Sequence, residues 1–370
     1  GTSANSIDLA EDRERFEELC EKLNINRPKG LTIFTCEEAL EATKKLGYPV
    51  LLRPSYVLGG QNMIVAFNDD DVKEYMKIIL AQGIENPVLI DQYMMGVELE
   101  VDGICDGEDV LIPGIMEHIE RTGIHSGDSI AVYPSWNLND VLREKIVKQS
   151  QDLALKLGTK GLVNIQYLIY NNDLYIIEVN PRSSRTVPYI TKVTNVPVIE
   201  IATRIMLGES LKSMGYETGI APETKTVAIK VPVFSTEKLP QVEVSLGPEM
   251  RSTGEVLGIG NNFSEAMFKG FVGAGTSIPK KDSRIFASIR DSEKEKFLPL
   301  AKKLDELGCK FISTTGTAKF LEENGIKVEV CKKVSEGVPN ILDIIRSGMI
   351  DFIVDIPSKA NNVNSDGFKI

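Results

Sequence analysis

The stretch LVNIQYLIYNNDLYIIEVN, residues 162–180, decides the fold of the first part of this chain. Two runs rich in β-branched and aromatic residues, 162–170 and 174–180, flank the polar turn 171–173. Alternating runs of this kind around an Asn/Asp-rich turn are typical of a β-hairpin. The stretch therefore predicts two adjacent antiparallel strands joined by a three-residue loop.

The expected hairpin brings polar side chains onto one patch. A three-residue loop sets Gln166 opposite Glu178 and Asn164 opposite Asn180, and opposed Cβ atoms lie about 4.5–5.5 Å apart. Glu178 and Asn180 are two positions apart, so they share a face. Carboxylate and amide oxygens suit Mg²⁺ or Mn²⁺, which completes its shell with phosphates and water. We expect a metal site formed by Gln166, Glu178 and Asn180.

Two arginines, Arg182 and Arg185, follow the second strand in IEVNPRSSR. Guanidinium groups at this place are suited to hold phosphoryl oxygens or a carboxylate-like substrate. The alternative is a solvated strand end with an ordinary Glu–Arg ion pair, because polar hairpin faces are common.

The composition is that of an ordinary globular protein. The 370 residues include 42 Lys+Arg and 53 Asp+Glu, a net charge of −11, with 42% hydrophobic and 26% charged residues. This excludes a disordered, collagenous or coiled-coil chain and predicts two or three domains. The acidic balance argues against nucleic acid or an anionic membrane as partner. No apolar run approaches the roughly 18 residues of a spanning helix, so we expect a soluble, cytoplasmic protein with no membrane contact.

Cysteines and histidines narrow the chemistry. The five cysteines are scattered without a CxxC pair, and this odd number fits a reducing compartment. The only histidines are His118 and His125, which disfavours a His-based zinc site and leaves oxygen ligands for a hard metal.

Three further segments of the first part carry candidate chemistry. Residues 97–102 alternate Val/Leu with Glu/Asp, which predicts a strand with one solvated face. Arg53 lies at a strand end in LRPSYVLGGQNM (52–63), where a Gly-Gly turn lets backbone N–H groups approach a phosphate. EHIERTGIHSGDS (117–129) predicts a tight polar loop able to hold a nucleoside. An ordinary turn is the alternative for both segments, since no Walker lysine pattern follows the first.

A strand–helix alternation begins near residue 277 and predicts a small doubly wound α/β unit with a parallel sheet. Within STTGTAKFL (313–321), Thr314 ends a strand and Thr317 begins the next helix. Ligands bind at the carboxyl edge of such sheets, where helix N-termini favour anions. Lys294 and Lys333 add positive charge, and the alternative is Thr317 as a plain N-cap.

The chain also starts and stops abruptly, so we expect a piece of a longer protein.

Taken in order, these segments closely resemble the large subunit of the carbamoyl phosphate synthetase family over nearly the whole chain. The strings that carry the resemblance are IDLAEDRERF (7–16), LLRPSYVLGGQNM (51–63), VDGICDGEDVLIPGIMEHIERTGIHSGDS (101–129), NIQ (164–166), IEVNPRSSRTVP (177–188) and TGEVLGIG (253–260). The resemblance implies an α/β and α+β chain. Its expected parts are an ATP-grasp domain at 1–206, a packed connecting segment at 207–276 and a truncated methylglyoxal-synthase-like allosteric domain at 277–370.

The resemblance implies the second synthetase half, an ATP-dependent ligase unit that phosphorylates carbamate to carbamoyl phosphate in arginine or pyrimidine biosynthesis. It implies as partners the N-terminal synthetase half, a glutaminase small subunit and a nucleotide effector, with an oligomer in the full-length protein. The alternatives are an ATP-grasp carboxylate–amine ligase or biotin-carboxylase-like enzyme, and a nucleotide-binding module that is inactive as isolated.

Site residues follow from the resemblance position by position. It implies ATP contacts at Arg53, Gln92, Met94, Glu98, Gly123, Ile124, His125, Ser126, Gln166 and Glu178. It assigns the divalent cations to Gln166, Glu178 and Asn180, and catalysis to Arg182, Arg185 and Glu178, with Arg13 as a further phosphate candidate. It places a phosphate-bearing effector at Ser288, Lys294, Thr314, Thr317 and Lys333. Asp355 and Pro357 depart from relatives that bind uridylate, so the effector stays open.

Overall fold

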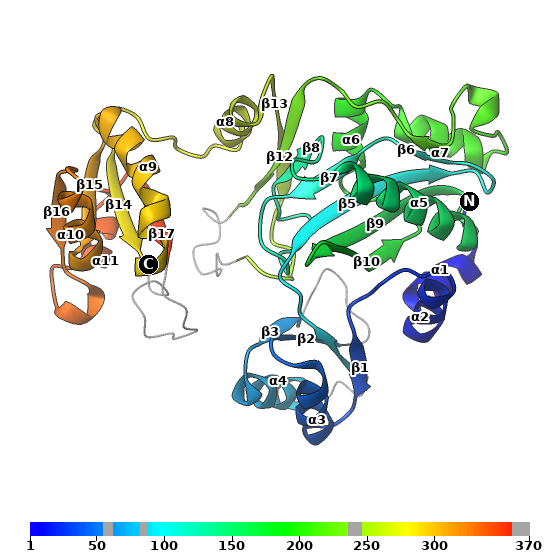
Figure 1. Ribbon diagram of the computed structural model, residues 1–370, viewed down its shortest axis with the longest axis horizontal. Coiled ribbons are helices and arrows are strands. Elements are labelled where there is room, and N and C mark those ends of the chain that lie inside the picture. The colour runs from blue at the N-terminus through cyan, green and yellow to red at the C-terminus, as the bar shows by residue number, and fades with distance from the viewer. Residues whose placement is uncertain (55–61, 82–86, 236–245, 357–370) are drawn as a thin grey trace. The chain divides into compact units, whose positions relative to one another are not determined.

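The computed structural model describes residues 1–54, 62–81, 87–235 and 246–356 (Figure 1). Its chain separates into two compact units, Gly1–Ala274 and Gly275–Ile370, here called unit 1 and unit 2. No helix in these described ranges is long and apolar enough to cross a membrane. The finer division at 206/207 and 276/277 remains a prediction.

Unit 1 combines helices with two sheets. Its helices are α1 (Ala4–Glu11), α2 (Arg13–Lys22), α3 (Cys36–Leu46), α4 (Asp69–Ala81), α5 (Asp140–Lys156), α6 (Val187–Thr194), α7 (Val198–Met206), α8 (Phe263–Gly273) and the 3₁₀ turn η1 (Lys212–Met214). Its strands are β1 (Gly30–Ile33), β2 (Val50–Pro54), β3 (Ile64–Ala66), β4 (Val88–Gln92), β5 (Val97–Cys105), β6 (Val110–Ile112), β7 (Ile115–His118), β8 (Ala131–Tyr133), β9 (Gly161–Tyr170), β10 (Asp173–Asn180), β11 (Gly219–Ile220), β12 (Val227–Val233) and β13 (Gly254–Gly260).

Unit 2 alternates strands with helices. Its elements are β14 (Arg284–Ile289), η3 (Asp291–Glu293), α9 (Lys294–Glu306), β15 (Lys310–Thr314), α10 (Thr315–Glu323), β16 (Val328–Cys331), η4 (Val334–Glu336), α11 (Ile341–Arg346) and β17 (Phe352–Ile356). The sheet order is β16-β15-β14-β17 with every pairing parallel, which confirms the predicted doubly wound α/β unit. The helix expected from Thr317 begins earlier, at Thr315, and Thr314 is its N-cap.

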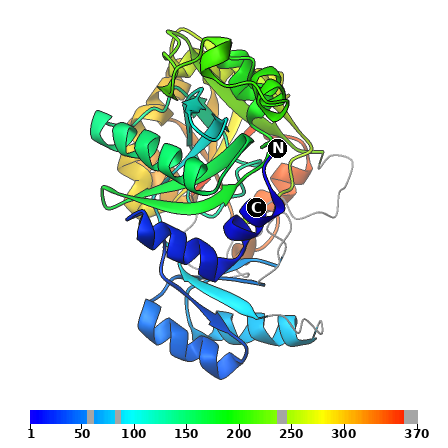
Figure 2. The same ribbon diagram turned by 90° about the vertical axis from the view of Figure 1, so that its right-hand side faces the viewer.

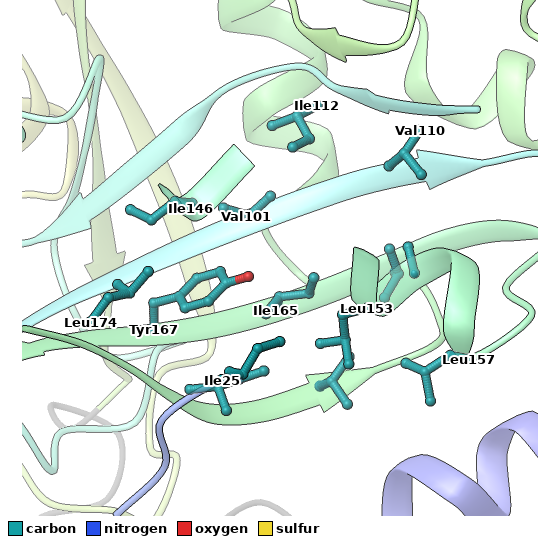
Figure 3. Close-up of a cluster of buried hydrophobic side chains, with 14 of the residues drawn as sticks. Ile25, Val101, Val110, Ile112, Ile146, Leu153, Leu157, Ile165, Tyr167 and Leu174 are labelled. Atoms are coloured by element: carbon teal, nitrogen blue, oxygen red, sulfur yellow. The ribbon is translucent and has the colours of Figure 1, made fainter. Parts of the chain in front are cut away.

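The larger sheet of unit 1 runs in the order β10-β9-β5-β7-β8-β12-β13. On one face, Val101 and Ile165 pack against Ile146 and Leu153 of α5 (Figure 3). On the other face, Ile104 belongs to a core shared with α6 and α7. Because successive side chains of a strand point to opposite faces, both faces of β5 are covered.

The smaller sheet, ordered β1-β4-β2-β3, is antiparallel throughout. Helices α3 and α4 pack side by side on one of its faces (Figures 1 and 2). The core between them includes Leu52 and Ile90, both fully buried. This sheet presents Arg53 and Gln92 on neighbouring strands.

The predicted hairpin forms, and the predicted pairs Gln166–Glu178 and Asn164–Asn180 are confirmed. The three-residue loop is wrong: the turn is Asn171-Asn172, with φ of 50° and 65°, and Asp173 already pairs with Tyr170. A bulge between Ile176 and Glu178 then shifts the register by one residue. An inserted residue of this kind moves every later side chain to the other face, and here it sets Glu178 opposite Gln166.

The solvated face predicted for residues 97–102 is wrong. Glu98, Glu100 and Asp102 are 8%, 2% and 2% exposed. They face the core side covered by α6 and α7, so their carboxylates depend on internal partners instead of water.

Helix α8 lies close against β12 and β13, and Gly258 on β13 allows this approach. A Cβ on Gly258 would lie 2.2 Å from the Ala266 carbonyl oxygen and 2.5 Å from the Gly270 nitrogen. On Gly254 of the same strand, a Cβ would meet only Val233, at 4.0 Å.

We predict that Gly258→Ala lowers the free energy of unfolding of unit 1 by about 2 kcal/mol, because the helix must move off the strand. Urea unfolding followed by fluorescence measures this, since Trp136 is the only tryptophan and its ring lies 4.6 Å from that of Phe263 at the start of α8. Gly254→Ala is the matched control and keeps the wild-type midpoint. Equal effects of the two substitutions would contradict the prediction.

Candidate functional site

The three expected metal ligands come together on the paired strands β9 and β10. The amide nitrogen of Asn180 lies 2.5 Å from Glu178 Oε1, and Gln166 is the cross-strand partner of Glu178. Glu178 is exposed, whereas Asn180 is buried. The patch therefore offers carboxylate and amide oxygens, a donor set that fits Mg²⁺. In the described ranges, no group of three or more His, Cys, Asp or Glu side chains is arranged to hold a metal ion, and this patch contains one such side chain, Glu178.

The arginine segment, residues 181–186, continues directly from β10. Arg182 donates to Asn180 Oδ1 at 3.0 Å and to the Ser183 carbonyl at 3.1 Å. Arg185 is exposed. Arg182 thus lies next to the Glu178–Asn180 pair, and Arg185 follows three residues later on the same segment.

A loop, residues 119–130, faces the same patch. Ser126 Oγ accepts from Gln166 Nε2 at 3.4 Å, which links the loop to β9. Burial lowers the pKa of His125, while Glu178 acts to raise it and Arg185 to lower it. The contact between Ser126 and Gln166 therefore joins the loop to the strand pair that carries Glu178.

The loop's backbone is fixed from inside the unit. Lys230, fully buried on β12, donates to the carbonyl of Ser126 at 2.9 Å. Asp128 accepts from the backbone N–H groups of Arg251 and Ser252, both at 2.8 Å. Gly123 adopts φ +88°, which an L side chain rarely takes.

The residues expected to contact the nucleoside are either half-buried or buried. Gln92 is half-buried at the end of β4, and Met94 and Ile124 are buried. Glu98, expected to face a ribose, lies at the end of β5 and accepts from the Gly123 N–H at 3.1 Å. Its second oxygen lies 3.4 Å from His118 Nδ1.

Arg53 belongs to a compact ion-pair cluster at the edge of the smaller sheet. Asp91 lies 3.4 Å from Arg53 Nε and 2.7 Å from an Arg13 nitrogen. Glu17 pairs with both Arg13 and Arg27. Burial and the charge of Arg13 lower the pKa of Arg27 to about 10, against the opposing effect of Asp91.

Sequence reasoning missed a layer of buried polar side chains under the site. Glu100 lies between His118 Nε2, at 3.3 Å, and Asn164 Nδ2, at 2.7 Å. Asn164 also donates to Asp102 at 2.9 Å, and Thr186 Oγ1 lies 2.6 Å from Asp102 Oδ2. One sequence signal points to this layer: the strand VAIKVPV (227–233) carries a lone lysine among apolar residues, and a buried lysine requires partners.

Charge pairing in this layer shifts several pKa values. Burial opposes charge on Glu100, but the hydrogen bond from His118 and its positive charge hold the pKa of Glu100 below its usual value. Burial and the charge of Glu100 raise the pKa of Asp102 to about 6. Burial acts to lower the pKa of His118, yet hydrogen bonds to Glu100 and Glu98 raise it to about 9. His118 is therefore an imidazolium held between two carboxylates at neutral pH.

In unit 2, the expected effector residues follow the carboxyl ends of three parallel strands. Thr317 accepts from the Ile289 N–H at 3.0 Å, and Lys294 donates to the Gly316 carbonyl at 2.7 Å. Ser288 pairs in register with Asp355, and Lys333 follows β16 and is exposed. The Gly-Gly turn at 58–61 and Pro357 lie outside the described residues.

We predict that His118→Gln removes a pH dependence of stability. Since folding raises the pKa of His118 from 6.5 to about 9, its contribution is complete below pH 6.5 and is lost as pH rises through 9. The loss is on the order of 3 kcal/mol. Urea midpoints measured from pH 6 to pH 10 should fall for the wild type. The midpoints of His118→Gln should fall less over the same range.

The other histidine is the control. The pKa of His125 is lowered, so its neutral form is favoured on folding and His125→Gln retains the wild-type fall in stability. A His118→Gln variant with the wild-type slope would show that His118 is not charged in the folded protein.

Known proteins match this chain in sequence and in fold. A family model described as "Carbamoyl-phosphate synthase L chain, ATP binding domain" matches residues 12–214, and an "MGS-like domain" matches residues 296–370. A relative from Clostridium botulinum, "Carbamoyl phosphate synthase large chain", is 55% identical over 370 residues. That alignment covers the whole of this chain and 35% of the relative, so the chain spans about a third of the relative's length.

Solved structures of ATP-grasp proteins share the fold at low sequence identity. N5-carboxyaminoimidazole synthase from Aspergillus clavatus, with ADP, has a TM-score of 0.57 at 14% identity, over 72% of this chain and 73% of that one. The biotin carboxylase domain of 2-oxoglutarate carboxylase from Hydrogenobacter thermophilus, with MgADP and bicarbonate, has a TM-score of 0.52 at 21% identity, over 62% and 52%. With a family model over more than half its length and this relative along all of it, the chain belongs to the carbamoyl-phosphate synthase large-chain family.

Proposed function

We propose that unit 1 transfers the γ-phosphoryl group of ATP to carbamate and so forms carbamoyl phosphate and ADP. The observation that carries the proposal is that Gln166, Glu178 and Asn180 come together beside Arg182, with Arg185 three residues further along the same segment. Phosphoryl transfer depends on positioning and charge neutralisation more than on a covalent intermediate. A site with acids, amides and arginines but no activated nucleophile suits that chemistry.

Gln166, Glu178 and Asn180 are the residues that would hold Mg²⁺, or Mn²⁺. When bound there, the metal neutralises phosphate charge and orients the transferring group. The fit rests on their carboxylate and amide oxygen donors. ADP and magnesium bound to the related Hydrogenobacter thermophilus domain are consistent with it.

In the proposed transfer, a carbamate oxygen attacks the γ-phosphorus and the bond from that phosphorus to the β–γ bridging oxygen breaks. ADP leaves with the bridging oxygen's electron pair. Arg182 and Arg185 hold the equatorial oxygens of the transferring group and the carbamate. Arg182 is already oriented by Asn180, which reduces the ordering that the reaction requires.

The nucleotide is proposed to lie between the smaller sheet and the loop 119–130. Arg53 would contact phosphate, while Gln92 and Met94 would line the base slot. Gly123, Ile124, His125 and Ser126 would hold the nucleoside from the loop, whose backbone is fixed by Glu98 and Lys230. Glu98 would accept from ribose hydroxyls through its remaining lone pairs.

Partners of the whole protein follow from the family and stay proposals. The length of the relatives agrees with an N-terminal synthetase half on the same chain. A glutaminase small subunit, an oligomer of the full-length protein, a cytoplasmic location, and a role in arginine or pyrimidine biosynthesis complete the proposal.

A biotin-carboxylase-like ligase is the weaker alternative. The fold neighbours support it at low identity only, and such an enzyme does not account for the MGS-like unit 2. A nucleotide-binding module without turnover is the second alternative, because the chain spans only part of its relatives.

Unit 2 is proposed to bind a phosphate-bearing nucleotide effector at the carboxyl edge of its sheet. Lys294 and Lys333 supply positive charge there, and Ser288, Thr314 and Thr317 supply hydroxyls and the start of α10. Asp355 has a buried carboxylate oxygen without a hydrogen-bond partner, and burial raises the pKa of Asp355. This group supports an effector whose base donates a hydrogen bond at that point.

We predict that the chain forms ATP from ADP, carbamoyl phosphate and Mg²⁺, the reverse of the proposed reaction. Glu178→Gln should lower the rate on the order of 100-fold, because an amide replaces the charged member of the metal patch. A luciferase-coupled assay measures ATP, and EDTA should abolish the wild-type signal.

Glu144→Gln is the matched control, since Glu144 is exposed on α5 and outside the site. Nucleotide binding without ATP formation would favour the inactive module, and carboxylation of free biotin would favour the other ligase. Glu178→Gln with wild-type activity would remove the metal patch from the proposal.

We predict that Lys294→Gln weakens binding of uridine or inosine monophosphate to unit 2 by about tenfold, the effect of losing one charged hydrogen bond. Calorimetric titration of the chain measures it. Lys302→Gln, an exposed position on the same helix, is the control. Equal affinities of the two variants would place the effector elsewhere.

A further inference from the structure

Thr186 occupies the N-cap position of α6 without capping the helix. Its side chain makes no hydrogen bond to the first turn, and its backbone is already helical, with φ −78° and ψ −10°. A threonine at an N-cap usually accepts from a backbone N–H of that turn. The Thr186 hydroxyl is therefore used for something else.

That hydroxyl points to the buried acids of β5. Thr186 is 3% exposed, and its Oγ1 lies 2.6 Å from Asp102 Oδ2 and 3.2 Å from Glu100 Oε1. A hydroxyl has one proton to donate, so the shorter contact, to Asp102, is the hydrogen bond. Ser184 Oγ, 2.8 Å away, then donates to Thr186.

The two carboxylates that Thr186 contacts, Glu100 and Asp102, are themselves held in place by other hydrogen bonds. Asn164 donates to Glu100 at 2.7 Å and to Asp102 at 2.9 Å, and it lies opposite Asp102 on the neighbouring strand. Both acids are 2% exposed. A hydrogen bond to fixed, buried carboxylates defines position more strictly than one to a solvated group.

The arginine segment is thus tied at both ends. At its start, the Arg182 backbone N–H donates to the Asn180 carbonyl at 2.7 Å and the Arg182 guanidinium to the Asn180 side chain. At its end, Thr186 is held by Asp102. Arg185 precedes Thr186 directly and is exposed, so the second tie fixes the backbone from which its side chain extends.

We propose that Thr186 is a positioning residue that fixes Arg185 at the reacting group through its hydrogen bond to the buried Asp102. This inference deepens the proposed phosphoryl transfer and rests on it. Arg182 keeps its own tie to Asn180, so loss of the Thr186 hydroxyl affects Arg185 selectively.

The test combines Thr186→Val with Arg185→Ala in the ATP-forming assay. Thr186→Val keeps the shape but removes the hydroxyl, and we expect kcat to fall about tenfold with the KM for ADP unchanged, since misplacing a positioning group costs rate. Thr186→Ser restores kcat. In the Arg185→Ala background, Thr186→Val has no further effect, because the two residues act as one unit.

Thr43→Val is the control for loss of a buried threonine hydroxyl. Thr43 is 2% exposed on α3 and donates to the Leu40 carbonyl at 2.9 Å, outside the site. If Thr186→Val lowers kcat no more than Thr43→Val, or if its effect multiplies with that of Arg185→Ala, the proposal is overturned.

A second readout does not depend on activity. Trypsin cleaves after both Arg182 and Arg185. We expect Thr186→Val, but not Thr186→Ser or Thr43→Val, to speed cleavage of the Arg185–Thr186 bond several-fold, while the Arg182–Ser183 bond is cleaved at the wild-type rate. If the wild-type chain makes no ATP, the proposed function is contradicted. If cleavage of Thr186→Val is unchanged, the proposed role of the Thr186 hydrogen bond is contradicted. The two failures are therefore distinguishable.

Discussion

Two carboxylates without water constrain the rest of unit 1. Glu100 and Asp102 lie on the central strand β5 at 2% exposure, and burying an ionised carboxylate is costly unless charges and hydrogen bonds compensate. The compensation comes from several elements. His118 is on β7, Asn164 on β9 and Thr186 at the start of α6. The hydrogen bonds of the two carboxylates therefore form only when β7, β9 and the start of α6 each lie in their observed positions beside β5.

The same requirement reaches the candidate site. Glu98 and Lys230 hold the loop 119–130, and Thr186 holds the segment 181–186. Both therefore depend on the layer of buried polar side chains under the site. Of the residues proposed to hold the metal or the transferring group, Glu178, Arg182 and Arg185 are exposed and carry little packing of their own. Their positions are instead determined by fully buried neighbours, an arrangement that gives rigidity without covering the reactive face.

The fold class and the pairing of the candidate metal residues could be predicted from the sequence, because hairpin pairing and strand–helix alternation are local patterns. The other candidate site residues came from the family resemblance and stay predictions. The cross-strand pair Gln166–Glu178 was correct although its loop was not: a shorter turn and the bulge before Glu178 compensate each other. The buried acids of β5 were predicted to face solvent. Alternation of apolar and acidic residues shows that the two faces of a strand differ, but it does not show whether water or other side chains surround the acidic face. Lys230 and Thr186 are far from β5 in sequence, so only tertiary structure brings them to it.

The sharing of Asp91 between Arg13 and Arg53 has a consequence for selectivity. The carboxylate is tethered to the same sheet, so its effective concentration at the guanidinium groups is far above that of a free small anion. A free anion must compete with this carboxylate for the two guanidinium groups, and an anion that contacts several groups at once competes better than a monovalent one.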